Sequence, residues 1–296
     1  MTSDSLAFKA LVADSRLAGK VLSGNIDDYP DGIVIPIDKP YRWTSADVVR
    51  KIKRAACRHF GKKNLKVGHA GTLDPLATGV LLVCVGKATR LAESFQKEGK
   101  EYVAGISFGA TTPSYDLEKP VDKLYPLDKV SEKAVRELLP KFVGEQEQVA
   151  PLFSAKSVDG VRAYELARKQ YKEKGKAKTD VFEDFDHSQV ASLNVQKINI
   201  YEMELLAFER EHSGETPMPD PAGRINIADT SGLVLPLATI RIGCSKGTYI
   251  RALARDLGEA LGSGAHLNSL RRTKTGGFKV EAALTVDQAV ELFPFP

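Results

Sequence analysis

Apolar residues recur along the chain with two spacings, one typical of strands and one typical of helices. Continuous or alternating apolar residues predict five strands, at 32–38, 80–85, 101–108, 198–208 and 235–244. Apolar residues three and four positions apart predict five helices, at 45–60, 131–142, 161–168, 248–261 and 285–293. The strand at 80–85 is apolar at every position, so we expect it to be buried on both faces.

Strands and helices follow one another without a regular strand–helix–strand alternation. This order favours an α+β fold with a mixed sheet over a doubly wound parallel sheet. We expect residues 1–32 to be an extension outside the main fold and residues 33–296 to form one domain. Residues 65–78 predict a loop, and the stretches near 169–190 and 209–233 predict surface insertions because they are rich in charges or prolines.

The composition excludes several classes of protein. With 43% hydrophobic and 27% charged residues, the 296-residue chain is typical of a globular protein with a sizeable core. No apolar run approaches the roughly 20 residues of a membrane span, and no secretory signal opens the chain. Cys57, Cys84 and Cys244 lack the spacing of a metal site, so we expect no metal, free thiols and a cytoplasmic location.

Positive charge is concentrated in one stretch. The net charge is only +4, but residues 45–66 hold eight basic side chains against the single acid Asp47. Three of the eight, Lys62, Lys63 and Lys66, follow the end of the predicted helix. Two interpretations remain open from charge alone: the solvated face of an amphipathic helix, or a surface that binds phosphates.

The segment Gly68–Gly79, GHAGTLDPLATG, is the strongest candidate for chemistry. Its three glycines and one proline constrain a loop that places His69 and Asp74 beside the buried strand. An acid in such a place is often only a turn residue or a helix cap. A nucleotide-binding loop around Gly86-Lys87 is not supported, because six residues separate its glycines where four are needed and Ala88 replaces the serine or threonine.

Here the sequence resembles a known family, the TruB family of tRNA pseudouridine synthases. GHAGTLDPLATG resembles the catalytic motif of that family, and further blocks are similar in the same order along the chain. They are Ile37-Asp-Lys-Pro40, Lys100-Glu-Tyr102-Val, Gly160-Val-Arg-Ala-Tyr164, Cys244-Ser-Lys-Gly-Thr-Tyr-Ile-Arg251 and Gly264-Ala-His-Leu-Asn-Ser-Leu-Arg-Arg272. The resemblance implies a pseudouridine-synthase fold with a mostly antiparallel sheet, flanking helices and a central RNA-binding cleft.

The resemblance also implies the reaction and the residues that perform it. Uridine in the T-loop of tRNA, at position 55, is flipped out and converted to pseudouridine by exchanging its C1′–N1 bond for a C1′–C5 bond, with no cofactor. Asp74 would be the catalytic carboxylate, Arg251 its ion-pair partner and Tyr102 the residue that stacks on the uracil. Four further residues would bind or support the substrate, and they are His69 as a wedge, Lys39 behind the motif loop, and Tyr249 and Leu270 around the base. Lys62, Lys63 and Lys66 would contact the RNA backbone.

Two departures from the family pattern stand out. The middle block of the family usually reads P-x-x-S-A-x-K, whereas this chain has Pro151-Leu-Phe-Ser-Ala-Lys-Ser157. Its lysine, Lys156, therefore stands one position earlier than the lysine of the family pattern. Only 18 residues follow Phe278, too few for the C-terminal PUA domain that many members carry. The expected partner is therefore the T-arm of tRNA, bound by a monomer without an obligate protein partner or a membrane. Two alternatives remain: a guide-RNA-dependent synthase, and a non-catalytic RNA-binding protein on the same scaffold.

Overall fold

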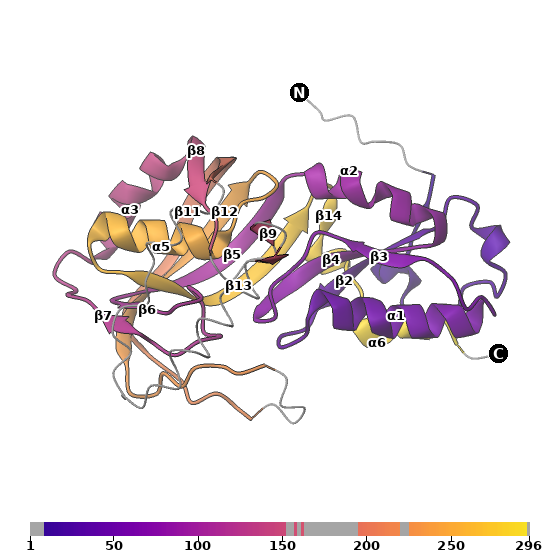
Figure 1. The fold of residues 1–296 in the computed structure, drawn as a ribbon, viewed down its shortest axis with the longest axis horizontal. Helices are drawn as coiled ribbons and strands as arrows, with labels where there is room; N and C mark the ends of the chain where they lie inside the picture. The colour runs from indigo at the N-terminus through magenta and orange to yellow at the C-terminus, as the bar shows by residue number, and fades with distance from the viewer. Residues whose placement is uncertain (1–8, 152–156, 159–160, 163–194, 220–224, 295–296) are drawn as a thin grey trace. The chain divides into compact units, whose positions relative to one another are not determined.

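The computed structural model describes residues 9–151, 157–158, 161–162, 195–219 and 225–294 (Figure 1). The chain forms two compact units. Unit 1 contains residues 1–102 and 270–296, and unit 2 contains residues 103–269. The chain passes from unit 1 into unit 2 within strand β5 (Lys100–Phe108) and returns within strand β13 (Ala265–Thr275).

The centre of unit 1 is an antiparallel pair of strands, β2 (Ile33–Lys39) and β4 (Ala77–Val85). The opposite edge of β4 pairs with β3 (Val67–Ala70) near its carboxyl end and, in parallel, with β13 near its amino end. Two short strands complete this part of the sheet, β1 (Leu11–Val12) parallel to β2 and β14 (Phe278–Lys279) antiparallel to β13.

Strand β4 is apolar and fully buried from Val80 to Val85, because both faces of this stretch are covered. Val80, Leu82 and Cys84 pack in one cluster with Phe95 of helix α2 (Ala92–Lys97). Residues between them point to the opposite face, where helix α1 (Ser45–His59) packs against β3 and β4 (Figure 1). The expected burial of this strand on both faces is therefore observed.

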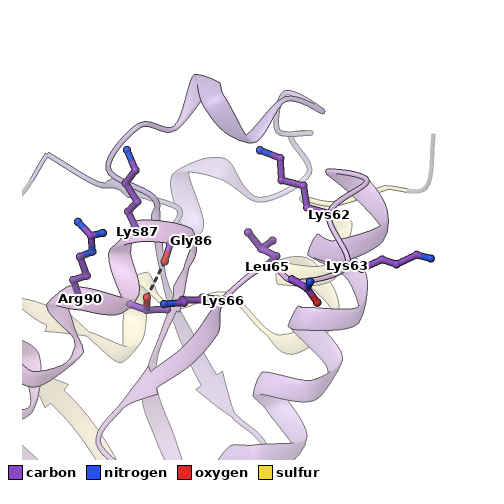
Figure 2. A pocket seen from close by; sticks show the side chains of 9 residues that line it. Lys62, Lys63, Leu65, Lys66, Gly86, Lys87 and Arg90 are labelled. Carbon is purple, nitrogen blue, oxygen red and sulfur yellow. Dashed lines mark hydrogen bonds between the residues drawn. The ribbon is translucent and has the colours of Figure 1, made fainter.

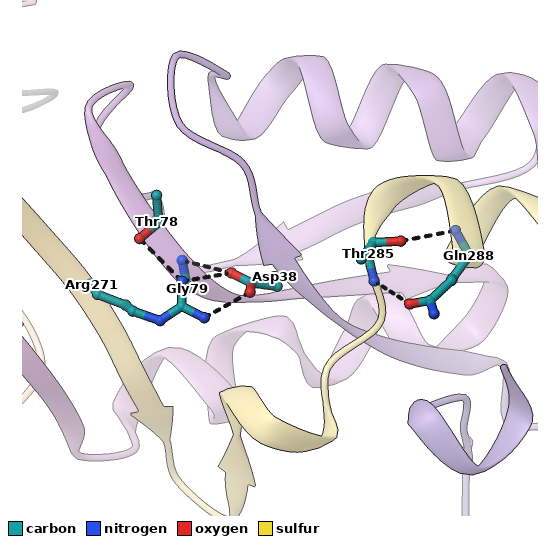
Figure 3. Close-up of polar contacts among 6 residues, drawn as sticks. All are labelled: Asp38, Thr78, Gly79, Arg271, Thr285 and Gln288. Atoms are coloured by element: carbon teal, nitrogen blue, oxygen red, sulfur yellow. Dashed lines mark hydrogen bonds and ion pairs between the residues drawn. The ribbon is translucent and has the colours of Figure 1, made fainter.

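Local sequence signals explain where two helices of unit 1 begin. Thr44 and Asp47 form a reciprocal capping box at the start of α1. Thr285 and Gln288 do the same for the short helix α6 (Val286–Glu291), as Figure 3 shows. In the described part of this unit, four 3₁₀ helices connect the strands and helices, η1 (Ser15–Leu17), η2 (Ile26–Asp28), η3 (Gly86–Leu91) and η6 (Val280–Ala282).

Unit 2 is built on strands that follow β5 in the order β12, β11 and β8. Long β11 (Val195–Ser213) pairs antiparallel with β12 (Val234–Cys244) and with β8 (Gly144–Val149). Among its described residues the helical segments are α3 (Glu132–Leu138), η4 (Leu139–Phe142) and α5 (Ile250–Leu261). Two small antiparallel pairs are added, β6 (Ala110–Thr111) with β7 (Lys123–Leu124), and β9 (Ser157–Val158) with β10 (Val161–Arg162).

The predicted α+β class with a mostly antiparallel sheet is confirmed, and several boundaries need correction. The N-terminal extension is not outside the fold, because Leu11 and Val12 pair with β2 and the Leu22 N–H donates to the carbonyl of Leu292. The predicted loop at 65–78 contains strand β3, and the predicted insertion at 209–233 begins inside β11. The helix expected at 161–168 starts with strand β10 instead, and the rest of it and the stretch 169–190 lie outside the described residues.

Candidate active site

Asp74 lies in the loop that joins β3 to β4. These two strands form an antiparallel hairpin, with Val67 opposite Val85 and Ala70 opposite Leu82, so residues 71–76 close it. Gly79, at the end of the motif, has a φ of +100° and crosses the backbone of Arg272 so closely that a Cβ would lie 2.1 Å from the carbonyl oxygen. Only glycine permits this approach, which explains why the motif ends on that residue.

A buried arginine of β13 holds the first half of this loop. The side chain of Arg272 is almost fully buried. Its Nε donates to the carbonyl of Val80 at 2.7 Å, and its two terminal nitrogens donate to the carbonyls of Gly71 (3.1 Å) and Thr72 (3.4 Å). A guanidinium has five donors in a rigid plane, so one side chain ties β4 to the residues just before Asp74.

Two residues from before the motif hold the second half. Lys39 is fully buried at the end of β2, and its Nζ donates to the carbonyls of Pro40 (2.9 Å), Trp43 (2.5 Å) and Pro75 (3.2 Å). Ser45, the first residue of α1, uses its Oγ both to accept from the N–H of Leu73 (3.0 Å) and to donate to its carbonyl (3.1 Å). Residues 73 and 75, on both sides of Asp74, are thus fixed by side chains.

Burial shifts the protonation of two groups around this loop. Desolvation lowers the pKa of Lys39 to about 8, although the carboxylate of Asp74 acts in the opposite direction. Desolvation also lowers the pKa of His69, and the positive charge of Arg272 adds to this. The Nδ1 atom of His69 is buried and has no hydrogen-bond partner among the described residues. His69 is therefore a neutral ring whose position comes from strand β3, opposite Val83, rather than from a hydrogen bond at this atom.

An ion pair between Arg271 and Asp38 supports the same end of β4. Arg271 pairs with Asp38 of β2 through two contacts, at 2.8 and 3.2 Å, and also reaches the hydroxyl of Thr78 (Figure 3). The same carboxylate accepts the N–H of Gly79 at 3.1 Å. This network fixes β13 beside β2 and β4 at the residue next to Leu270, which is half-buried and faces Ala77 in the parallel register.

The candidate residues of unit 2, Arg251 and Tyr249, have hydrogen-bond or ion-pair partners within that unit. Arg251, near the start of α5, is buried and donates to the carbonyl of Ser114 at 3.0 Å, and its Nε lies 3.7 Å from the Asp116 carboxylate, which is also buried. The backbone of Tyr249 is clamped by the buried side-chain amide of Gln148, which accepts from its N–H (2.9 Å) and donates to its carbonyl (3.1 Å). The ion pair expected between Arg251 and Asp74 joins residues of different units and stays a prediction.

The predicted RNA-backbone lysines line a surface recess of about 560 Å³, which we call the basic recess. Its basic residues are Lys62, Lys63, Lys66, Lys87 and Arg90, and none of the described residues that line it is acidic. Figure 2 shows the side chains of Lys87 and Arg90 rising from one segment and Lys62 from the other, whereas Lys63 extends away from them. A hydrogen bond of 2.8 Å from the N–H of Gly86 to the carbonyl of Lys66 joins the two segments.

The structure thus brings Asp74, Lys39 and His69 together in unit 1 and places Tyr102, buried in β5, at the border of that unit. Sequence reasoning missed the residues that hold the site, Arg272, Ser45 and Asp116, because buried hydrogen-bond partners leave no local pattern. Lys87 and Arg90 could have been found from their positive charge. Lys156 lies outside the described residues.

Comparison with known proteins agrees with the fold and the loop. The family model "TruB family pseudouridylate synthase (N terminal domain)" matches residues 58–250, and "tRNA pseudouridylate synthase B C-terminal domain" matches residues 251–293. The fold and the loop therefore define an enzyme of the pseudouridylate synthase class. The "tRNA pseudouridine synthase B" of Phocaeicola vulgatus is 45% identical over 264 residues, covering 89% of this chain and 94% of the relative. That of Bacteroides thetaiotaomicron is 47% identical over 257 residues, covering 87% and 91%. The chain belongs to the TruB family.

Solved structures show the same fold. The chain is 26% identical to a chain of the archaeal box H/ACA sRNP Nop10–Cbf5 complex, with a TM-score of 0.52 over 89% of this chain. It is 28% identical to a chain of a Cbf5–Nop10–Gar1 complex, with a TM-score of 0.53 over 87% of this chain. This chain spans about half the length of either solved chain, 54% in both cases. Among the described residues, no helix is long and apolar enough to cross a membrane.

Proposed function

We propose that this protein converts uridine to pseudouridine in tRNA, at position 55 of the T-loop. The curated relatives that match almost their whole length are named for this class of reaction. The observation that carries the proposal is the Asp74 loop, in which Arg272, Ser45 and Lys39 hold the residues on both sides of the carboxylate. Such immobilisation suits a group that must meet a reacting atom in one geometry.

The reaction needs no external reagent, because the base that leaves is the base that returns. The C1′–N1 bond breaks, the C1′–C5 bond forms, N1 gains a proton and C5 loses one. A carboxylate can act as nucleophile or charge stabiliser at such a glycosidic carbon. We assign this role to Asp74, and the assignment is supported by its place in the rigid loop.

The remaining residues take roles around the flipped base. Tyr102 stacks on the uracil, Tyr249 and Leu270 line its pocket, and Arg251 pairs with the catalytic carboxylate. His69, neutral and on the strand that leads into the loop, fills the space that the flipped base leaves in the RNA. A neutral ring loses less hydration energy than a charged one when it is buried against bases, so the lowered pKa of His69 supports this role.

Phosphate binding is the role proposed for the basic recess. Lys62, Lys63 and Lys66 contact the RNA backbone, and Lys87 and Arg90 extend the same surface. Exposed cations of this kind attract phosphates without reading sequence. The protein acts on the T-arm as a monomer, and its described cysteines, all free, suit the reducing cytoplasm.

Release of tritium from C5 tests this function. A tRNA transcript labelled with tritium at C5 of uridine is incubated with the protein, without cofactor or partner. We expect one equivalent of tritium to be released per tRNA, and none from a transcript with cytidine at position 55. No release from the bare transcript would contradict the proposal, and release only with an added guide RNA would favour the guide-dependent class. Binding without release would favour the non-catalytic alternative.

A further inference from the structure

Arg42 has a backbone conformation that an arginine rarely adopts. Its φ is +63°, in the left-handed region that glycine enters without cost and that a Cβ disfavours. Among the described residues only Tyr115 shares this feature without being glycine. The N–H of Arg42 donates to the carbonyl of Pro75 at 3.0 Å, the same oxygen that Lys39 reaches at 3.2 Å. Arg42 is therefore held one hydrogen bond away from the residue that follows Asp74.

One donor of the half-buried Arg42 side chain lacks a hydrogen-bond partner among the described residues. Its Nε is buried and has no hydrogen-bond acceptor among the described residues. Its guanidinium lies over the ring of Tyr41, with 5.9 Å from Cζ to the ring centroid, and that ring is 44% exposed. The Nε donor of a cationic side chain is thus left without an oxygen acceptor among the described residues.

The other arginines around the site differ in this respect. The guanidinium of Arg272 donates to three backbone carbonyls, and that of Arg271 to the Asp38 carboxylate. Glycine would meet the backbone geometry at position 42 without strain, so the turn itself gives no reason for an arginine. Strained residues with unsatisfied donors cluster at binding sites, where the ligand supplies the missing partner.

We propose that Arg42 is an RNA-binding residue whose guanidinium takes a phosphate oxygen of the strand next to the target uridine, with the ring of Tyr41 supporting it. This inference rests on the proposed function. The planar fork of arginine fits a phosphate through two parallel hydrogen bonds, which satisfies Nε and the charge together. Because the backbone of Arg42 is bonded to Pro75, a phosphate held here sets the distance between the RNA and Asp74.

Three substitutions separate the charge of Arg42 from its strain. Arg42→Gln removes the charge and keeps the strain, Arg42→Gly removes both, and Arg42→Lys keeps both but loses the fork. Lys20→Gln, at an exposed position, is the matched control for the loss of one charge. Tritium release from tRNA gives KM and kcat, binding is measured over a series of salt concentrations, and thermal unfolding reports the fold.

We expect Arg42→Gln and Arg42→Gly to raise KM about tenfold with little change in kcat, and Arg42→Lys to give an intermediate KM. The salt slope of binding should fall by roughly 0.7–0.9 in the first two variants, as for one lost phosphate contact. Arg42→Gly should unfold about 2–4 °C higher than the wild type, which keeps the test valid if Arg42→Gln folds poorly.

An unchanged KM in both uncharged variants would overturn the proposal. A raised KM with an unchanged salt slope would also overturn it, because the contact would then not be with a phosphate. An inactive wild type would instead contradict the proposed function, and the same assay shows this before any variant is made.

Discussion

The two ends of strand β4 carry positive charge in opposite ways. At the amino end, beside Asp74, Lys39 and Arg272 are buried and donate to backbone carbonyls. At the carboxyl end, about 26 Å along the strand, the lysines and Arg90 of the basic recess are exposed. Lys62 has one exposed ion pair there, with Asp27 at 3.4 Å.

The burial of a charged group determines how that group contributes at each end of the strand. A buried cation is tolerated only when its donors are satisfied, so it fixes the backbone that accepts them. An exposed cation fixes little, since exposed ion pairs contribute about 0–1 kcal/mol. It creates instead a potential that attracts phosphates over a distance. The buried cations at one end of β4 therefore fix the backbone of the Asp74 loop, whereas we propose that the exposed cations at the other end attract the RNA backbone.

The sharpest test of this contrast is Asp74→Asn, which keeps the shape of the side chain and removes its charge. We expect pseudouridine formation to fall below about one hundredth of the wild-type rate. Binding of tRNA should change little, because phosphate contacts dominate affinity and the basic recess is intact. Single-turnover isomerisation and binding are measured in parallel.

Asp31→Asn is the matched control, since Asp31 is exposed and lies outside the loop. It should behave as the wild type in both assays. Circular dichroism verifies that Asp74→Asn is folded. Activity of the folded variant above about one hundredth of the wild type would show that Asp74 is only a turn residue.

The next largest effect is expected for Arg272→Lys, because the single ammonium nitrogen of lysine cannot replace the three guanidinium nitrogens that donate to Val80, Gly71 and Thr72. Losing these buried, charge-assisted hydrogen bonds should cost about 3 kcal/mol in the free energy of unfolding and reduce kcat at least about tenfold through a looser Asp74 loop. Denaturant unfolding and single-turnover kinetics measure the two effects.

Arg271→Lys provides the comparison on the neighbouring position of the same strand. The Arg271–Asp38 pair is partly exposed, with side chains 43% and 31% accessible, so the cost should stay below about 1 kcal/mol. Equal losses of stability in the two variants would contradict the distinction between buried and exposed cations.

The dependence of stability on pH gives a third, smaller effect, from Lys39. Its pKa in the folded protein is lowered from 10.5 to about 8. Between these values the unfolded chain keeps a proton that the folded protein has released, so the stability of the wild type rises with pH across this window. The difference of about 2.5 pKa units corresponds to about 3 kcal/mol at most.

Lys39→Met lacks this titration, so the difference in free energy of unfolding between wild type and variant should grow in favour of the wild type from about pH 8 to about pH 10. For Lys20→Met, at an exposed lysine, the difference in free energy of unfolding from the wild type should not change with pH. Denaturant unfolding at several pH values measures the difference. A difference that stays constant with pH for Lys39→Met would show that burial does not lower the pKa of this amine.

The kcat of the wild type should fall in the same pH window, because a neutral amine has only two N–H donors for the three carbonyls that Lys39 contacts.

The smallest effect is expected at the opposite end of β4. Lys66→Glu combined with Lys87→Glu reverses one charge on each segment of the basic recess. We expect tRNA affinity to fall about tenfold at low salt, the salt slope to decrease by roughly 0.7–0.9 per lost contact, and kcat to stay unchanged. Thermal stability should stay within a few degrees of the wild type.

Lys129→Glu with Lys133→Glu applies the same change in charge to exposed lysines of unit 2. A matching loss of affinity in this control would mean that net charge alone is responsible. An unaltered affinity in the recess variant would make the recess a solvated surface.

Much of the architecture was predictable because it depends on short-range patterns. The spacing of Val48, Ile52 and Ala56 predicts the helix that became α1, and the continuous apolar stretch predicts the buried strand β4. Strand β3 was missed because its four residues, VGHA, have no strand pattern and are held by pairing with β4. The N-terminal segment was misplaced for the same reason, since only two of its residues pair with β2.

The family resemblance, the α+β class and the candidate carboxylate can all be predicted from the amino-acid sequence, because motifs and periodicity are local properties of a chain. Which groups surround that carboxylate depends on the tertiary structure. Arg272, 198 positions after Asp74 in the chain, reaches the loop because β13 pairs in parallel with β4. Asp116 meets Arg251 because a loop and a helix far apart in sequence pack together. Burial then sets the protonation of Lys39 and His69, since desolvation depends on what the folded chain places around a charge.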